Sequence, residues 1–144
     1  MSAYARNSNI GAYKSVSIHG AVAGADPHHL VLMLMEGVME RLAVARASIE
    51  RGDIGKKAKL LHSCNTLLGE LRGSLNMTHG GPLARNLNEL YEYMMRQLLR
   101  ANAESNIEYI KEVSGLLGEV RSAWAAIGPE VRQMHTTGEV ALTR

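Results

Sequence analysis

Histidine, cysteine and glutamate are the residues of this chain whose chemistry could support metal binding or catalysis. A di-iron helical bundle needs Glu-x-x-His pairs, because each metal takes a carboxylate and an imidazole one helical turn apart. No glutamate here is followed by a histidine three positions later. His28 and His29 are adjacent, so on a helix their side chains point about 100° apart, which favours a capping or solvated role over a shared ion. The sequence therefore predicts no metal site and no cofactor.

His62 is the candidate for a histidine phosphotransfer site, since such domains are small helical bundles with an exposed histidine in mid-helix. It faces away from the apolar stripe that contains Leu61 and Leu68. A cation one turn further on would hold the phosphoryl group, but Ser, Cys, Asn and Thr are the four residues that follow. We keep phosphotransfer as the weaker alternative and expect His62 to stay unmodified by a phosphodonor.

The single cysteine, Cys64, falls within the apolar arc of its predicted helix. A thiolate is disfavoured in such surroundings, so a buried structural cysteine is expected rather than a nucleophile. One cysteine cannot form an internal disulfide, which fits a protein of the reducing cytoplasm. No glycine-rich phosphate loop occurs either, and the sequence therefore predicts a protein that is not an enzyme.

Composition narrows the remaining classes. A chain of 144 residues with 46% hydrophobic residues fits one globular domain. Its net charge of +2 gives no reason to expect nucleic acid as a partner. The longest purely apolar run, residues 30–35, is far short of the roughly 20 residues that a membrane span needs, so no membrane insertion is expected.

Hydrophobic spacing predicts an all-α fold, an antiparallel up-down-up-down four-helix bundle over residues 26–128. The helices are expected over residues 27–51, from 54 to about 76, from 82 to about 101, and from about 105 to 127. Residues 1–25 show no sustained period and are interpreted as an N-terminal arm, and residues 129–144 as a flexible tail. The connections between helices are short, which forces consecutive helices to run antiparallel.

Three of these helices carry more apolar surface than one bundle seam uses. The core stripe predicted for the third helix is Leu83, Leu87, Leu90, Met94, Leu98 and Ala101. Tyr91, Met95 and Leu99 lie to one side of that stripe. Leu60 and Leu67 form a similar shoulder on the second helix, and Leu32 and Met39 lie on the far side of the first. Apolar surface outside the core indicates a partner surface, a homodimer seam, or a site covered by the chain's own arm. Tyr13, Val16 and Ile18 suit an arm that docks on the bundle and is displaced by a competing segment.

Several short motifs resemble the flagellin chaperone family (FliS), and they occur in the order typical of that family between Ala12 and Ile127. The motifs are Ala12-Tyr13, Val16, Asp26-Pro27-x-x-Leu30-Val31-Leu32-Met33-Leu34-Met35-Glu36-Gly37, Leu90-Tyr91-Glu92-Tyr93-Met94, Leu98-x-x-Ala101-Asn102, Glu112-Val113 and Arg121-x-Ala123-Trp124. Each motif is weak alone, and their ordered combination carries the resemblance.

The resemblance implies a cytoplasmic export chaperone that binds the disordered C-terminal region of flagellin, prevents premature polymerisation and delivers it to the export gate of the flagellar type III secretion apparatus. It also implies an N-terminal strap, here Tyr13 and Val16, that occupies part of the cargo path until flagellin arrives. On this chain we expect Leu60, Leu67, Tyr91, Met95 and Leu99 to line the flagellin groove. A self-associating structural bundle is kept as a further alternative.

Overall fold

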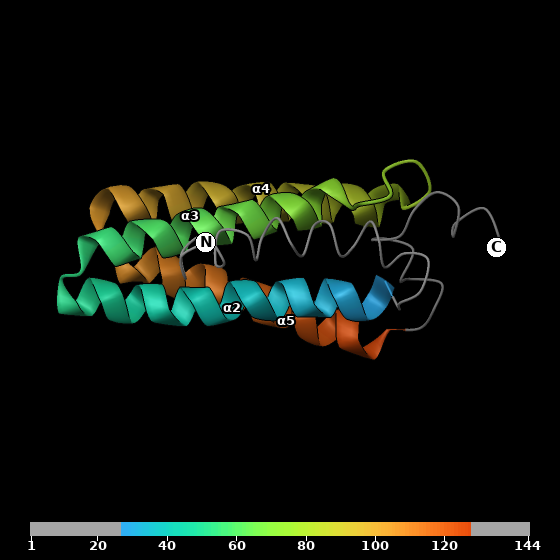
Figure 1. The fold of residues 1–144 in the computed structure, drawn as a ribbon. Helices are drawn as coiled ribbons and strands as arrows, with labels where there is room; N and C mark the ends of the chain where they lie inside the picture. Colours follow the sequence, from blue (N-terminus) through green and yellow to red (C-terminus); the bar gives the residue numbers. More distant parts are fainter. Residues whose placement is uncertain (1–26, 128–144) are drawn as a thin grey trace, which may run out of the picture.

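The fold is known from a computed structural model, in which residues 27–127 are described. These residues form four helices and no strand: α2 (Pro27–Arg51), α3 (Ile54–Gly73), α4 (Gly81–Glu104) and α5 (Ile107–Ala126). Figure 1 shows them side by side as a bundle. The predicted all-α four-helix bundle is therefore confirmed for this part of the chain. The arm over residues 1–25 and the tail over residues 129–144 lie outside the described residues.

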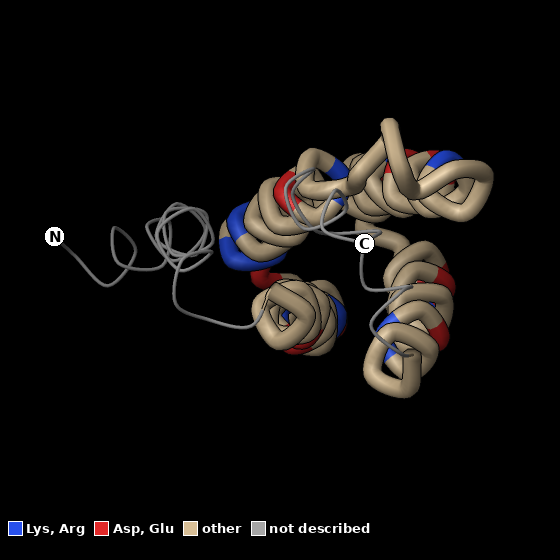
Figure 2. The backbone as a smooth tube through the Cα atoms, turned by 90° about the vertical axis from the view of Figure 1, so that its right-hand side faces the viewer, with Lys and Arg blue, Asp and Glu red and all other residues tan. Residues whose placement is uncertain are grey.

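Contacts between the start of one helix and the end of another show that α2 runs antiparallel to α5, and α3 to α4. His28, at the start of α2, bonds to Trp124 near the end of α5. Lys57, at the start of α3, bonds to Asn102 near the end of α4. Each helix packs against the next one along the chain, and α5 packs against α2, so the four close into a ring. Figure 2 looks along this ring from the end where α2 begins and α5 ends.

The helix boundaries follow from local hydrogen bonds. α2 begins and ends at the residues expected from the sequence, and Gly52 takes the positive φ of 77° that a tight turn needs. The Asp53 side chain then accepts a hydrogen bond from the backbone N–H of Lys56 and so caps α3. α3 ends at Gly73, earlier than predicted, and the Ser74 hydroxyl donates to the carbonyl of Leu71 at 2.8 Å.

The connection between α4 and α5 differs from the prediction. Residues 102–104 were expected to link the two helices, but α4 continues to Glu104. The turn is made by Ser105, which adopts a left-handed φ of 49°, and Asn106, whose side-chain oxygen accepts the backbone N–H of Glu108 at 2.9 Å. A sequence reading of composition alone misses this turn, since neither residue is a glycine or a proline.

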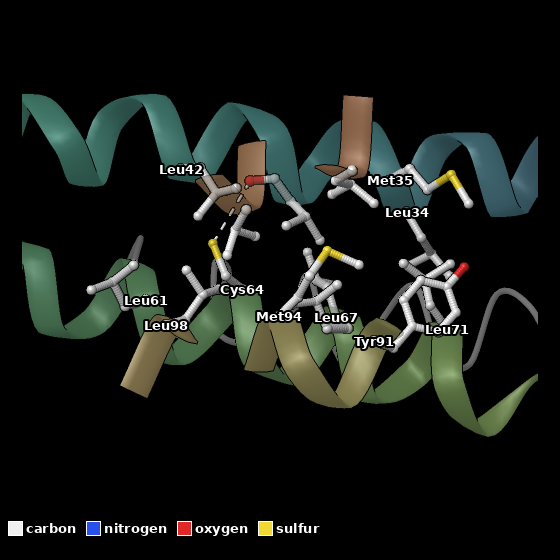
Figure 3. Packing of buried hydrophobic residues seen from close by; sticks show 14 of the residues in the cluster. Leu34, Met35, Leu42, Leu61, Cys64, Leu67, Leu71, Tyr91, Met94 and Leu98 are labelled. Carbon is white, nitrogen blue, oxygen red and sulfur yellow. Dashed lines mark hydrogen bonds between the residues drawn. The ribbon is translucent and has the colours of Figure 1, made fainter. Parts of the chain in front are cut away.

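Buried residues recur at alternating steps of three and four on every helix, which is the heptad spacing of helices that pack at a shallow angle. The buried apolar cluster, part of which appears in Figure 3, includes Val31, Met35, Val38, Leu42 and Ala45 of α2, Leu61, Cys64, Leu68 and Leu71 of α3, Ala84, Tyr91, Met94, Leu98 and Ala101 of α4, and Ile110, Val113, Leu117 and Trp124 of α5.

The predicted core stripe of α4 is wrong in its first half. Leu83 is 46% exposed and Leu90 is only partly buried, whereas Ala84 and Tyr91 are fully buried. The heptad spacing selects the positions of Ala84 and Tyr91, although leucine is the more hydrophobic residue at the neighbouring positions. Ile54, at the start of α3, is 55% exposed. Apolar side chains are therefore left at the surface on both flanks of the bundle.

Candidate partner-binding surface

Cys64, the only cysteine of the chain, has a structural role and not a catalytic one. Cys64 is fully buried, and its thiol lies 3.7 Å from the carbonyl oxygen of Val38 (dashed line in Figure 3). Burial raises the pKa of this thiol to about 12, so it stays protonated and unreactive at neutral pH. This confirms the expected structural cysteine. Within residues 27–127, no three His, Cys, Asp or Glu side chains gather in a way that could hold a metal ion.

His28 is buried and therefore not solvated, and it caps a carbonyl in the last turn of α5. Its Nε2 donates to the carbonyl oxygen of Trp124 at 2.7 Å, and the indole Nε1–H of Trp124 donates to the carbonyl oxygen of His28 at 3.0 Å. The two rings are stacked, with centroids 5.0 Å apart. This reciprocal pair, together with the ion pair between Arg121 and Glu36, ties the end of α5 to α2. We call this set of contacts the α2/α5 seam.

Two of the predicted groove residues belong to the core. Leu67 and Tyr91 are both fully buried, and Figure 3 shows their side chains among the other core residues. The expectation that they lie outside the core stripe is wrong, because the heptad register turns Tyr91 inward and the close packing of α3 on α2 covers the flank that carries Leu67. Burial also raises the pKa of the Tyr91 hydroxyl, which keeps it neutral.

Leu99 and Met95 lie at the surface between α3 and α4, as predicted for α4. Leu99 is 62% exposed, and Met95 is half-buried. The Met95 methyl group lies 3.9 Å from the position that a Cβ at Gly69 would take, and the Asn65 side-chain amide donates to the Met95 carbonyl at 3.3 Å. Ile54 and Ala58 share this face of α3, since they precede Asn65 at helical steps. We call Ile54, Ala58, Met95 and Leu99 the α3/α4 seam.

Leu60 does not join that seam. It lies on the flank of α3 that faces α2, which is marked by the hydrogen bond from Arg41 to the Ser63 hydroxyl at 2.8 Å. Leu60 is partly buried there, so some of its surface remains available. The five residues predicted to line one groove are thus divided: two are internal, two lie on α4 at its border with α3, and one lies on the flank of α3 that faces α2.

A third apolar surface lies between α4 and α5, and the sequence did not predict it because its α4 residues were expected in the core. Partly exposed apolar side chains lie on the adjoining flanks of α4 and α5, over the half of the bundle nearest the end of α5. They are Leu83, Leu87 and Leu90 of α4 and Leu116, Val120 and Ile127 of α5. We call these six residues the α4/α5 seam. A heptad count along α4 would have found it, because it leaves Leu83 and Leu90 beside the core positions and not on them.

Polar groups close the middle of the same two helices. The Glu112 carboxylate accepts hydrogen bonds from the Tyr93 hydroxyl and from the Gln97 side-chain amide, the latter at 2.9 Å. These bonds stabilise the ionised form and lower the pKa of Glu112, and the same carboxylate raises the pKa of Tyr93. Gln97 is buried, but the Tyr93 hydroxyl and the Glu112 carboxylate lie near the solvent, so screening limits the energy of their contact.

Comparison with known proteins decides the class of this protein. The family model described as "Flagellar protein FliS" matches residues 8–131. The chain belongs to the FliS family. A FliS relative from Pseudomonas aeruginosa, named flagellar secretion chaperone FliSB, is 44% identical over 115 residues, covering 80% of this chain and 91% of that protein. The flagellar secretion chaperone FliS of Salmonella typhimurium is 41% identical over 124 residues, covering 85% and 92%.

The FliS of Vibrio cholerae, also named a flagellar secretion chaperone, is 36% identical over 131 residues, which cover 91% of this chain and 96% of that protein. As a FliS protein the chain is an export chaperone and not an enzyme. The phosphotransfer alternative for His62 is therefore set aside. Among residues 27–127, no helix is both long and apolar enough to cross a membrane.

Proposed function

We propose that this FliS protein binds the C-terminal region of flagellin in the cytosol, keeps it from polymerising and delivers it to the flagellar export gate. The single observation that carries the binding step is the exposure of Leu99, at 62%, beside the half-buried Met95 on a bundle whose core is already complete. A leucine in this position adds nothing to the interior. It gains free energy only when another chain covers it.

The shape of the seams suits a helical cargo. Ile54, Ala58 and Gly69 give α3 a face of small or exposed apolar residues beside Met95 and Leu99. A segment that is disordered when free can fold as an amphipathic helix over such a face, with its own apolar residues at helical steps. Flagellin assembles by burying apolar helix faces, so covering those faces blocks assembly by direct competition. Cargo that passes around α3 would also cover Leu60 on the opposite flank.

The strap and the oligomeric state extend this proposal. Tyr13, Val16 and Ile18, which lie outside the described residues, would occupy part of the cargo path in the free protein and leave it when flagellin binds. Delivery requires that the loaded complex be recognised by the export gate. A homodimer through the α3/α4 seam is the competing use of the same apolar side chains, and light scattering over a concentration series distinguishes the two.

Isothermal titration with a peptide of the flagellin C-terminal region tests the proposal. Coupled folding should give a negative heat-capacity change. Leu99→Asp should weaken binding by about tenfold or more, equivalent to about 1.4 kcal/mol, while the free energy of unfolding changes by less than about 0.5 kcal/mol. Ala43→Asp is the matched control, because Ala43 is an exposed apolar residue on α2, away from this seam.

Two results would reject the proposal. Absence of peptide binding at tens of micromolar would remove flagellin as the cargo. Equal weakening by Leu99→Asp and Ala43→Asp would mean that the acidic charge acts at long range and that the α3/α4 seam is not the contact.

A further inference from the structure

The α4/α5 seam flanks the core and keeps exposed apolar surface that the flagellin contact proposed above does not use. Leu83 is 46% exposed, and the other five residues are partly buried. Both hydrogen bonds described above between these helices, from Tyr93 and Gln97 to Glu112, lie toward the middle of the bundle and away from Ile127. At the Ile127 end, α5 is instead held to α2 by the pair of His28 and Trp124. The flank of α5 that faces α4 is therefore the apolar one.

We propose that the chain's own C-terminal segment, residues 128–144, docks on the α4/α5 seam. The segment begins at the seam itself, because Ile127 is one of the six residues of the α4/α5 seam. The next two residues, Gly128 and Pro129, favour a reversal of chain direction. From Leu83 to Leu90 the seam measures about 10 Å along α4, at 1.5 Å per residue. Seventeen residues reach about 25 Å as a helix and roughly twice that when extended, so the segment is long enough to cover the seam.

The composition of the segment fits this site. Val131 and Met134 are three residues apart, so in a helical turn they would share one side and could pack against the leucines of α4 and α5. Met suits an irregular apolar surface because its side chain is flexible. Glu89 and Glu119 are exposed and precede Leu90 and Val120 of the seam in the sequence, and Arg132 of the segment carries the opposite charge.

With this segment docked, the chain would cover its own apolar surface at a second place, besides the N-terminal strap. This place is a different seam from the proposed cargo contact at Leu99. The family match ends at residue 131, so most of the segment lies beyond what this chain shares with the family model. The inference therefore concerns this chain in particular. A second copy of the chain on the same seam is the alternative occupant that the experiment must separate.

Disulfide trapping in the full-length protein tests the contact. Cys64 is buried with a raised pKa, so it does not compete with introduced thiols. The variant Leu83→Cys with Met134→Cys places one thiol on the seam and one on the segment. The control is Leu99→Cys with Met134→Cys, because Leu99 lies on the α3/α4 seam and is more exposed than Leu83. Both helix positions are exposed, so neither cysteine opens the core.

Under mild oxidation without cargo, the Leu83 pair should form an intramolecular disulfide about tenfold faster or more than the Leu99 pair, because docking raises the effective concentration of the two thiols. The product should migrate as a compact monomer on a non-reducing gel. Equal rates for the two pairs, or no disulfide from the Leu83 pair, would overturn the proposal. A disulfide-linked dimer would overturn it in favour of a second copy. Because flagellin is absent, these outcomes are independent of the titration described above.

Circular dichroism of both variants in the reduced state guards against a folding defect. Val131→Asp combined with Met134→Asp supplies a second measurement: faster amide hydrogen exchange should appear in peptides that contain Leu83–Leu90 and Leu116–Val120, and not in those that contain Met95–Leu99. Unchanged exchange at the α4/α5 seam in this variant would also overturn the proposal.

Discussion

α5 presents two flanks to its neighbours, and they differ in chemistry. Toward α2 it offers a stacked aromatic pair with two buried hydrogen bonds, an Arg121–Glu36 ion pair and the close approach of Met39 to Gly118. Toward α4 it offers partly exposed aliphatic side chains and one solvent-screened carboxylate. The same helix is therefore fixed from one side and left available on the other. A chaperone can keep apolar surface for binding without losing its fold when a different seam supplies the fixed geometry.

Among substitutions on the two flanks of α5, removal of the Trp124 indole should lower the free energy of unfolding the most. Trp124→Ala loses the buried ring, its stacking on His28 and a hydrogen bond at once, and the free energy of unfolding should fall by about 3–5 kcal/mol in urea titrations. Trp124→Phe keeps a ring in place and should lose much less. A loss below about 1 kcal/mol for Trp124→Ala would mean that the α2/α5 seam does not fix α5.

Substitution of Lys57 tests whether contacts from α3 fix the end of α4 in place, in contrast to the weaker contacts from α5. Its ammonium group is buried and donates to the Asn102 carbonyl at 2.8 Å and to the Ser105 hydroxyl at 2.9 Å, where it also opposes the negative end of the α4 dipole. Lys57→Met should lower the free energy of unfolding by about 1.5–3 kcal/mol. The exposed neighbour Lys56 is the control, and Lys56→Met should change it by less than about 0.5 kcal/mol.

Gly118 measures how tightly α5 fits against α2. A Cβ at this position would lie 3.6 Å from the Met39 methyl carbon, an ordinary van der Waals distance, so Gly118→Ala should stabilise by about 0.5–1 kcal/mol through helix propensity. Gly115→Ala, with open space around the new methyl group, should gain a similar amount. If thermal unfolding shows a gain at Gly115 and a loss at Gly118, the α2/α5 seam is packed more closely than the distance suggests.

Substitution of Glu112 should produce the smallest change in the free energy of unfolding, and this change should depend on pH. Hydrogen bonds from Tyr93 and Gln97 lower its pKa in the folded protein, so the carboxylate stabilises the fold above its unfolded pKa of about 4.3, and this contribution disappears as the pH falls through the lower folded value. The difference in unfolding free energy between the wild type and Glu112→Gln should therefore shrink between pH 7 and pH 3.

The sequence predicted the helices well because their signals are local. Pro27 and Asp53 mark helix starts by their own chemistry, and Gly52 marks a stop, so α2 was predicted to the residue. The turn at Ser105 and Asn106 escaped prediction, since a left-handed serine is held there by a hydrogen bond from its backbone N–H to the Ala101 carbonyl and by the ammonium group of Lys57, which comes from a distant part of the sequence.

The binding surface was harder to predict than the fold. Leu99 was placed correctly, because it lies far from the core by any helical count. Tyr91 and Leu83 were exchanged in their roles: a half-polar aromatic was expected outside and a leucine inside, and the heptad geometry of the neighbouring helices decided the opposite. Residue hydrophobicity cannot separate two adjacent flanks of one helix when both are apolar, and only the direction of the neighbouring helix can.

The buried thiol of Cys64 can also report on transient local opening of the bundle. The sulfur lies between α2 and α3 with no surface exposed, so a colourless disulfide reagent reaches it only in those moments when these helices part. The rate at which colour develops would then count the openings of the bundle, with and without bound flagellin, and no label would have to be introduced.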